Sequence, residues 1–470
     1  YQPAEQDESD GYYKIGNAGQ LYWFAEKVNY YNQGYINGKL TANIVVNQNV
    51  LDADGNLNSD TEDFRVWTPI GDLSSYRATF DGQGYTVSGL YNEWKAYDNL
   101  GLFGVTINAE IKNVGIVDSY FYARRYVGGV CGFNSGNSKI TNCYNAGAVG
   151  ASDPNSDSYV GGVCGFNMGS INNCYNKGII NASSSIGYYG GVCGYNNGGS
   201  IANCYNIGTI GMSGGEYGSV CGYNSAVASI SNCYYLDGDA EVGVKQDNSG
   251  NAETTVKTDK QFASGEVAWL LNGSAAGENP AWRQTIGADN YPVFDTESGI
   301  VVKTTPTSLN SIIRPTAGTI DNATAVYNFA GIKGTSVYGI EYTEPLLAAN
   351  HPYIFTTDKT YVNFVPADEE VADDTDTCGL TGVLEADGKM VYGKNNTAGE
   401  PVSIVFTATA LKYANQNGNM VKYGKCYIDA DEGIITTISA MASKIAPAFE
   451  DGVDGLENVT IDSITEGETY

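Results

Sequence analysis

The sequence contains few basic residues, a single histidine and no long apolar run, and each shortage excludes a class of protein. Lys and Arg number 25 against 53 Asp and Glu, and the net charge of −28 disfavours nucleic acid and anionic membranes as partners. No apolar run approaches the roughly 20 residues of a membrane span. No Cys-x-x-Cys pair occurs and no Gly-x-Ser-x-Gly motif lies near His351, so neither zinc binding nor a Ser-His-Asp hydrolase is indicated. The composition agrees with an exported protein.

Four copies of one motif occupy the middle of the chain. They are VGGVCGFNSGNSKITNCYNAGAV (127–149), VGGVCGFNMGSINNCYNKGII (160–180), YGGVCGYNNGGSIANCYNIGTI (189–210) and YGSVCGYNSAVASISNCYYLDG (217–238). A fifth, degraded copy precedes them at 100–117. The first cysteines of the four copies are 33, 29 and 28 residues apart, a period typical of a solenoid. We therefore expect function on the surfaces of a stack of coils.

The apolar stretches within each copy are very short and are separated by Gly, Asn and Ser. They lack the i, i+3, i+4, i+7 spacing of a helix, so each copy is predicted to form one coil of a parallel β-helix. Asparagines recur at two positions, where they tolerate left-handed backbone and can bond the next coil. These columns, interpreted as structural, are Asn134, Asn167, Asn196, Asn224 and Asn142, Asn173, Asn203, Asn232.

The repeated cysteines are predicted to be buried thiols that stack in ladders. The degraded copy has Phe103 and Val114 where the first full copy has Cys131 and Cys143. Both positions therefore tolerate plain apolar residues, as buried free thiols do. Disulfides between neighbouring coils are the alternative, although in-register parallel strands orient their side chains poorly for such a bond.

The motif GGVCGxNxGxIxNCYNxG resembles the GLUG repeat, with Val-Cys in place of the usual Leu-Val. The resemblance extends to lead-in segments such as NAGQLYWFAEKVN (17–29) and to closing segments such as FASGEVAWLLNG (262–273), and covers roughly residues 12–296. GLUG proteins are similar to large exported surface proteins of bacteria, especially gut Bacteroidetes, and to non-catalytic flanks of some secreted peptidases. The resemblance implies a right-handed β-helix and an adhesion role, and it supplies no catalytic residues.

The predicted fold class is all-β: a right-handed parallel β-helix with short capping helices, followed by an antiparallel β-sandwich-like domain. The β-helix spans 1–298, with clear repeats at 100–238 and helical caps at 12–30 and 260–273, which would cover the apolar ends of the solenoid. Alternating apolar segments after Phe294 predict the second domain at 299–455, and 456–470 is predicted to be a flexible tail.

One loop has the spacing of a calcium site. Oxygen-bearing side chains alternate along it at Asp52, Asp54, Asn56, Asn58 and Asp60. Leu57 replaces the glycine of an EF-hand turn, and Asp63 replaces its bidentate glutamate, so a solvated acidic turn is the alternative. Calcium is the one cofactor that the sequence suggests. The acidic run at 366–376 is interpreted as a solvated loop.

Three functions stay open on sequence grounds. We expect a non-enzymatic adhesin or ligand-binding protein, extracellular or on the outer cell surface, that recognises host glycoprotein or polysaccharide. A clustered, solvent-facing row of Tyr or Trp on one flank would favour it. Uniformly polar faces would favour a passive stalk or scaffold. A groove with paired carboxylates would favour a β-helix carbohydrate-active enzyme. The sequence identifies neither the ligand nor the oligomeric state nor a membrane anchor.

Overall fold

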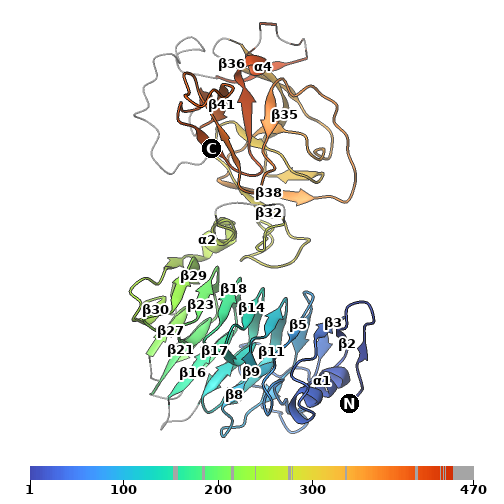
Figure 1. The fold of residues 1–470 in the computed structure, drawn as a ribbon, viewed down its shortest axis with the longest axis vertical. Helices are drawn as coiled ribbons and strands as arrows, with labels where there is room; N and C mark the ends of the chain where they lie inside the picture. Colours follow the sequence, from blue (N-terminus) through green and yellow to red (C-terminus); the bar gives the residue numbers. More distant parts are fainter. Residues whose placement is uncertain are drawn as a thin grey trace. The chain divides into compact units, whose positions relative to one another are not determined.

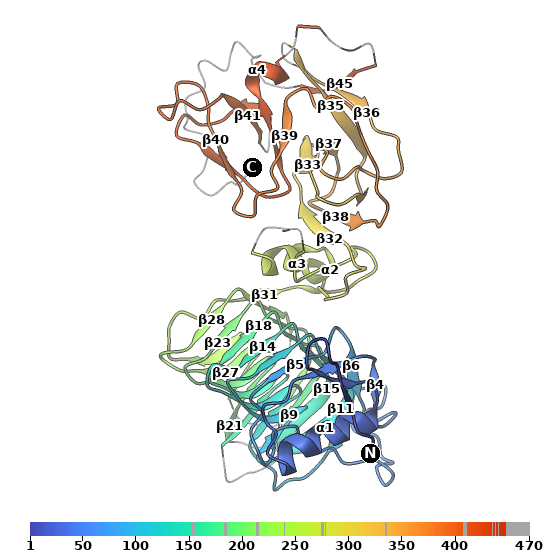
Figure 2. The same cartoon turned by 45° about the vertical axis from the view of Figure 1, so that its right-hand side comes forward.

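The computed structural model describes residues 1–447 except 152–156, 183–185, 213–215, 239, 274–276, 278, 334–335, 408–410, 435, 438 and 440. The chain divides into two compact units, Tyr1–Phe262 and Ala263–Tyr470. The first is a parallel β-solenoid and the second is built from antiparallel sheets, which confirms the predicted fold class (Figures 1 and 2). The predicted flexible tail, 456–470, lies outside the described residues.

Four sheets run along the solenoid, and every strand pair in them is parallel except β1 with β2. Sheet I contains, in spatial order, β1 (Glu5–Gln6), β2 (Tyr13–Ile15), β3 (Gly38–Leu40), β5 (Thr79–Asp81), β10 (Glu110–Lys112), β14 (Lys139–Thr141), β18 (Ser170–Asn172), β23 (Ser200–Ala202) and β28 (Ser229–Ser231). Sheet II contains β31 (Thr254–Lys257), β29 (Cys233–Leu236), β24 (Tyr205–Asn206), β19 (Tyr175–Asn176), β15 (Tyr144–Ala151), β11 (Gly115–Ala123), β6 (Thr86–Ser88) and β4 (Ile44–Val45), with β20 (Ile179–Ala182), β25 (Ile210–Met212) and β7 (Tyr91–Asn92) beside them.

The other two sheets meet at a bend in each coil. Sheet III contains β26 (Glu216–Gly218), β21 (Gly187–Gly190), β16 (Ser158–Gly161), β12 (Tyr126–Gly128) and β8 (Asn99–Leu100). Sheet IV contains β30 (Val244–Asp247), β27 (Cys221–Asn224), β22 (Cys193–Asn196), β17 (Cys164–Asn167), β13 (Cys131–Ser135) and β9 (Phe103–Ile107). Each full repeat follows the sheets in the order III, IV, I, II, and Figure 1 shows the strands stacked from β2 and β3 beside α1 to β29 and β30.

The bend explains how two adjacent apolar residues both reach the core. Val130 lies between β12 and β13, and its neighbour Cys131 begins β13; both are fully buried. Strand alternation would place one of such a pair outside. In the bend, however, the amides of Val130 and Cys131 both donate to the carbonyl of Val163 in the next coil, each at 3.1 Å. The alternation is therefore interrupted between the strands, and both side chains turn inward.

The first glycine of the bend is required by a close approach to the opposite sheet. A Cβ on Gly162 would lie 2.2 Å from the carbonyl oxygen of Gly191 and 2.3 Å from the amide carbon of Asn176. Real Cβ atoms do not occur at such distances, so only glycine fits. The Gly-Gly-Val-Cys sequence thus pinches each coil inward until the bend between sheets III and IV reaches the side chains of sheet II.

The segment at 12–30, predicted to be a helical cap, contains α1 (Ala18–Tyr30). The Asn17 side chain accepts a hydrogen bond from the Gln20 amide at 3.0 Å, as an N-cap does. Leu21, Phe24 and Val28 are buried in the solenoid core, where the Phe24 ring meets the edge of Phe80 at 5.9 Å. The helix therefore covers the apolar end of the first coil.

The predicted helical segment at 260–273 forms α2 (Asp259–Ala263) and α3 (Glu266–Leu271). Val267 and Leu271 are buried, Gly273 follows at φ +73°, and Trp269 packs against the cluster around Ile300 in the second unit. That this segment caps the solenoid stays a prediction, as does the domain division after residue 298.

The antiparallel strands expected in the C-terminal region are present. Its sheets are β32 (Ile300–Lys303), β38 (Tyr361–Pro366) and β34 (Gly318–Asp321); β33 (Asn310–Ile312), β37 (Tyr353–Thr356), β35 (Ala325–Lys333), β36 (Ser336–Glu341) and β45 (Ser443–Pro447); β39 (Leu380–Gly382), β44 (Cys426–Asp429), β41 (Ser403–Phe406) and β42 (Leu411–Tyr413); and β40 (Lys389–Val391) with β43 (Asn419–Val421). The short helix α4 (Ala430–Gly433) follows β44. Buried residues such as Phe329, Ile354 and Ile404 form a core of this C-terminal region.

Candidate ligand-binding surfaces

An aromatic surface, which we name the aromatic valley, lines the outer side of the bend between sheets III and IV. Its rings are Tyr126, Tyr159 and Tyr188 from sheet III and Phe133, Phe166, Tyr195 and Tyr223 from sheet IV. All of them are half-buried, neither enclosed in the core nor freely exposed. Sequence reasoning named such a row as the sign of a ligand-binding protein, but could not locate it.

The rings form two stacked columns because equivalent residues of successive coils are in register. In the sheet IV column, Phe166 stacks on Phe133 with ring centroids 4.9 Å apart and planes 7° apart, and Tyr223 stacks on Tyr195 at 4.4 Å. The strand spacing of about 4.8 Å sets this repeat. Columns of rings at one spacing therefore present a regular surface along the solenoid.

The two columns also contact each other across the bend. Tyr159 meets the edges of Phe166 at 5.6 Å and Tyr195 at 5.2 Å, and Tyr188 meets Tyr223 at 4.9 Å. Outward rings from two sheets that are joined at a bend touch only when the outer surface is concave at that bend. The inward pinch at the glycines thus creates the valley, and the edge-to-face contacts stabilise it.

Polar groups border the valley. The Arg125 guanidinium lies 5.1 Å from the centre of the Tyr126 ring, a cation–π distance. The Tyr159 hydroxyl donates to Asp157 at 3.3 Å. Burial raises the pKa of Tyr195 to about 12, so its hydroxyl stays protonated near neutral pH. The valley therefore combines aromatic surface with a few hydrogen-bonding groups, the usual makeup of a small-molecule site.

The asparagine columns are structural, as predicted. In sheet IV the amide of Asn134 donates to Asn167, and that of Asn167 donates to Asn196, each at 2.8 Å, and all three side chains are fully buried. The second predicted column has left-handed backbone; Asn142 has φ +53° and its amide donates to Asn113 at 3.0 Å. These side chains bond neighbouring coils to one another, so their role is structural.

A third asparagine ladder was missed from sequence. Asn145 donates to Asn176, and Asn176 donates to Asn206, each at 2.9 Å, and these side chains are buried against the pinched glycines. Its signal in the sequence is the asparagine that ends each Asn-Cys-Tyr-Asn segment. The third ladder, like the first two, holds neighbouring coils together.

A second surface, which we name the polar groove, lies beside β5, β10 and β14 of sheet I. Its volume is about 370 Å³. Its lining residues are Tyr35, Asn37, Arg77, Ala78, Thr79, Asn108, Ala109, Glu110, Asn137 and Lys139. Glu110 is the one carboxylate of this lining, so the groove does not have the paired carboxylates that a glycosidase uses. Sequence reasoning did not find it.

The candidate calcium loop forms a tight turn. The Asp52 carboxylate accepts hydrogen bonds from the amides of Asp54 and Asn56, each at 2.9 Å, and the Asn58 amide group donates to the carbonyl of Asn49 at 3.2 Å. Asp54 and Asp60 are exposed. Within the described residues no group of three His, Cys, Asp or Glu side chains is arranged to hold a metal ion. Calcium binding by Asp52, Asp54, Asn56, Asn58 and Asp60 stays a prediction.

The acidic run at 366–376 is exposed at Asp368, Glu369 and Glu370, but Asp373 is not a solvated residue. Its carboxylate accepts the Tyr353 hydroxyl at 3.0 Å and lies 3.6 Å from His351. Burial lowers the pKa of His351, so the ring is neutral at physiological pH. Asp373 therefore ties the acidic segment to β37, and this network is structural.

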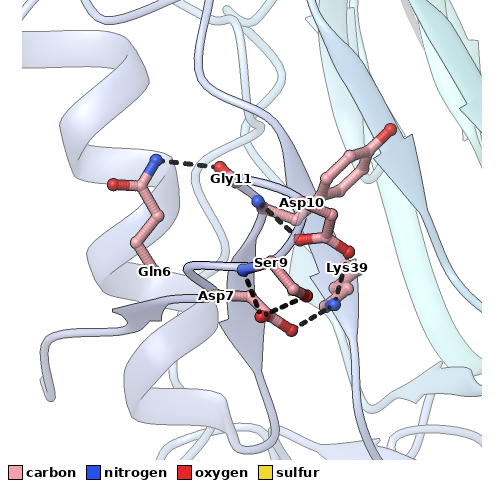
Figure 3. Close-up of polar contacts among 7 residues, drawn as sticks. Gln6, Asp7, Ser9, Asp10, Gly11 and Lys39 are labelled. Atoms are coloured by element: carbon pink, nitrogen blue, oxygen red, sulfur yellow. Dashed lines mark hydrogen bonds and ion pairs between the residues drawn. The ribbon is translucent and has the colours of Figure 1, made fainter.

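A charged cluster fastens the N-terminal hairpin to the solenoid (Figure 3). The Lys39 ammonium lies 2.6 Å from Asp7 and 2.7 Å from Asp10, and Ser9 donates to the Asp7 carboxylate at 2.7 Å. The hydrogen bond from Lys39 holds the pKa of both carboxyl groups below their ordinary values, and the same contacts raise the pKa of Lys39. The cluster joins the turn between β1 and β2 to β3, and this role is structural.

Comparison with known proteins supports the repeat assignment. The family model of the GLUG motif matches residues 123–150 and 156–181, so the chain carries GLUG-motif repeats. A structure of a putative immunoglobulin A1 protease from Bacteroides ovatus is similar at 18% identity and a TM-score of 0.39, over 63% of this chain and 95% of that one. An IgA1 protease structure is similar at 17% identity and a TM-score of 0.34, over 52% of this chain and 21% of that one. No curated protein matches.

The structural similarities are too low to support any argument about activity. Among the described residues, no helix is long and apolar enough to cross a membrane.

Proposed function

We propose that this GLUG-repeat β-helix protein is a non-enzymatic, secreted or cell-surface ligand-binding protein that recognises polysaccharide or glycoprotein glycans along the aromatic valley. The observation that carries the proposal is the pair of in-register ring columns in the valley. Sugar rings have apolar C–H faces and polar hydroxyl edges, so they pack on aromatic rings while their hydroxyls bond neighbouring polar groups.

The residue pattern within the valley agrees with stacking as the main interaction. The sheet IV column changes from Phe133 and Phe166 to Tyr195 and Tyr223, so the ring is kept while the hydroxyl varies. An extended polysaccharide is the ligand best suited to such a surface, because its repeating rings can contact several coils at once. Each contact can then be weak while the sum is specific.

A passive stalk is the second candidate, and the outer face of sheet I favours it. From β18 onward this face carries small and mostly polar residues: Ser170, Asn172, Ser200, Ala202, Ser229 and Ser231. Uniform polar faces of this kind are expected of a spacer that presents another domain. The two candidates differ in one testable respect, which is whether the valley binds glycans.

The test is binding of the full chain to a panel of immobilised polysaccharides and glycoproteins. The double variant Tyr159→Ala/Tyr195→Ala removes two rings that touch at 5.2 Å. We expect about a tenfold loss of affinity, because each aromatic contact is worth about 0.5–1.5 kcal/mol. Tyr195→Phe should bind like the wild type, since it keeps the ring.

The matched control is Tyr91→Ala/Tyr120→Ala, a stacked tyrosine pair 6.4 Å apart on sheet II, outside the valley. It should leave binding unchanged. Equal losses in the two double variants would contradict the valley as the site. Binding to no polysaccharide or glycoprotein would favour the stalk, and release of reducing ends from a bound polysaccharide would contradict a non-enzymatic role.

A further inference from the structure

The polar groove is cationic although the chain as a whole is strongly acidic. Among its lining residues are Arg77 and Lys139, and neither takes part in an ion pair among the described residues of the chain. The Glu110 carboxylate pairs instead with Lys112, 3.5 Å away and outside the lining. Two unpaired cations in one groove are notable where acidic residues outnumber basic ones 53 to 25. They favour an anionic ligand.

The amide side chains in the groove add donors rather than acceptors. The Asn37 oxygen accepts the Thr79 amide at 3.0 Å, and the Asn108 oxygen accepts the Asn137 amide at 2.9 Å. A backbone N–H already bonds each oxygen, and neither NH₂ group donates a hydrogen bond within the described part of the chain, so both can donate to a ligand. With the guanidinium and the ammonium, the groove offers a set of donors suited to the oxygens of carboxylate, sulfate and sugar hydroxyl groups.

The groove also contains one aromatic ring. Tyr35 is 73% exposed, so its ring is open to a ligand in the groove. A ring beside donors is the combination that recognises a sugar: the ring packs against the apolar face, and the donors bond the substituents. A bare inorganic anion would use the cations and leave Tyr35 without a function.

We infer that the polar groove binds a terminal acidic sugar of a glycan, one that bears a carboxylate or sulfate group. The guanidinium of Arg77 engages the acidic group in a forked pair of hydrogen bonds, and Lys139 adds a second positive charge. The volume of about 370 Å³ accommodates a mono- or disaccharide. The net charge of −28 repels long polyanions, so a short acidic terminus is favoured over a nucleic acid.

The test measures binding of small sugars to the full chain by calorimetry or by ligand-observed NMR. Glucuronic acid supplies the carboxylate and galactose 6-sulfate supplies the sulfate, while galactose is the neutral comparison and sodium acetate and sodium sulfate are the bare anions. We expect one or both acidic sugars to bind at least tenfold more tightly than galactose and than the matching bare anion, and to weaken in high salt. Which acidic sugar binds identifies the group.

Three variants separate the contributions of the groove. Arg77→Gln and Lys139→Gln should each reduce acidic-sugar affinity about tenfold or more, and Tyr35→Ala should reduce it without changing the response to the bare anions. Lys95→Gln, at an exposed lysine outside the groove, is the matched control and should bind normally. The inference is wrong if neither acidic sugar binds, if galactose or a bare anion binds as tightly, or if Arg77→Gln and Lys139→Gln bind like the wild type.

The groove and the aromatic valley share no lining residue, so their tests are independent. The Tyr159→Ala/Tyr195→Ala variant should retain acidic-sugar binding in the groove. Loss of polysaccharide binding in that variant, with the groove still active, would separate the two surfaces. Loss of acidic-sugar binding in that valley variant would contradict a groove that acts alone.

Discussion

The early coils of the solenoid, at 36–117 with the degraded copy included, and the coils of the four full repeats, at 127–238, fill the same kind of core in different ways. In the early coils single large rings interlock: Phe80 meets Phe103 edge-on at 5.3 Å, and Tyr76 lies 5.2 Å from Phe103. In the repeated coils the position of Phe103 is taken by Cys131 and then by Cys164 in register. The early coils thus pack through contacts between side chains of different shape, whereas the repeated coils pack by stacking equivalent side chains in columns.

The outer surface of sheet I also changes from the early coils to the repeated coils. The first outward position of sheet I is Thr79, Glu110 and Lys139 in successive strands, and then Ser170, Ser200 and Ser229. The polar groove lies where the early coils meet the first full repeat, and neighbouring coils supply unlike side chains there. The valley lies in the repeated coils, because only like side chains stack into a surface. Non-repeating coils therefore suit a discrete ligand, and repeating coils suit a polymer.

The largest expected effect comes from filling the space of a glycine in the bend. Gly162→Ala would place a Cβ 2.2 Å from the backbone of the next coil, so the coils must separate. We expect the solenoid to lose about 3 kcal/mol of unfolding free energy or fail to fold. This loss of unfolding free energy is measured by unfolding the full chain in urea and monitoring the circular dichroism.

Gly211→Ala, in the same solenoid, is the matched control. The nearest atom to its added Cβ would be 3.4 Å away, an ordinary contact, so the change should stay within about 0.5 kcal/mol. Similar losses at both positions would mean that glycine matters here for chain flexibility rather than for close approach.

Interrupting an asparagine ladder should have the next largest effect. Asn167→Ala removes a fully buried side chain that accepts from Asn134 and donates to Asn196. Both neighbours would be left with an unpaired buried polar atom, at a cost of about 2–3 kcal/mol. Unfolding by urea measures the loss. Asn137→Ala, at an exposed asparagine, should change the unfolding free energy by less than about 0.5 kcal/mol. A loss in Asn137→Ala equal to that in Asn167→Ala would contradict a stabilising role of the ladder.

The cysteine ladders give a kinetic prediction. The eight repeat cysteines are buried free thiols, so a reagent in solution reaches their sulfur atoms only when the coils open. We expect iodoacetamide to alkylate them at least about a hundredfold more slowly than the half-buried Cys378, and to react with all of them after unfolding. Mass spectrometry of native and urea-unfolded protein without reductant measures both. Cysteines still unlabelled after unfolding would indicate disulfides between coils.

Features that repeat in the sequence could be predicted, and features that depend on a bend or on distant residues could not. The period identified the coils, the fifth copy indicated buried thiols, and the segment at 12–30 was predicted to contain a helix. The valley was missed because strand alternation fails between Gly128 and Cys131, so the outward side of Phe133 was not predictable. The groove was missed because Tyr35, Arg77 and Lys139 meet only through the stacking of coils.

The smallest expected effect concerns the charged cluster at the N-terminal hairpin. The folded pKa of Asp7 and Asp10 is below the unfolded value, so their stabilisation is complete above the unfolded pKa and is lost as the pH falls through the folded pKa. Lys39→Met should therefore lower the thermal midpoint slightly at pH 7, and the difference from wild type should shrink between about pH 4 and pH 2. The effect is small because these ions are partly exposed. Lys95→Met, at an exposed lysine, should show neither the loss nor its pH dependence; a difference for Lys39→Met that persists unchanged at about pH 2 would point to packing of the Lys39 stem rather than to its charge.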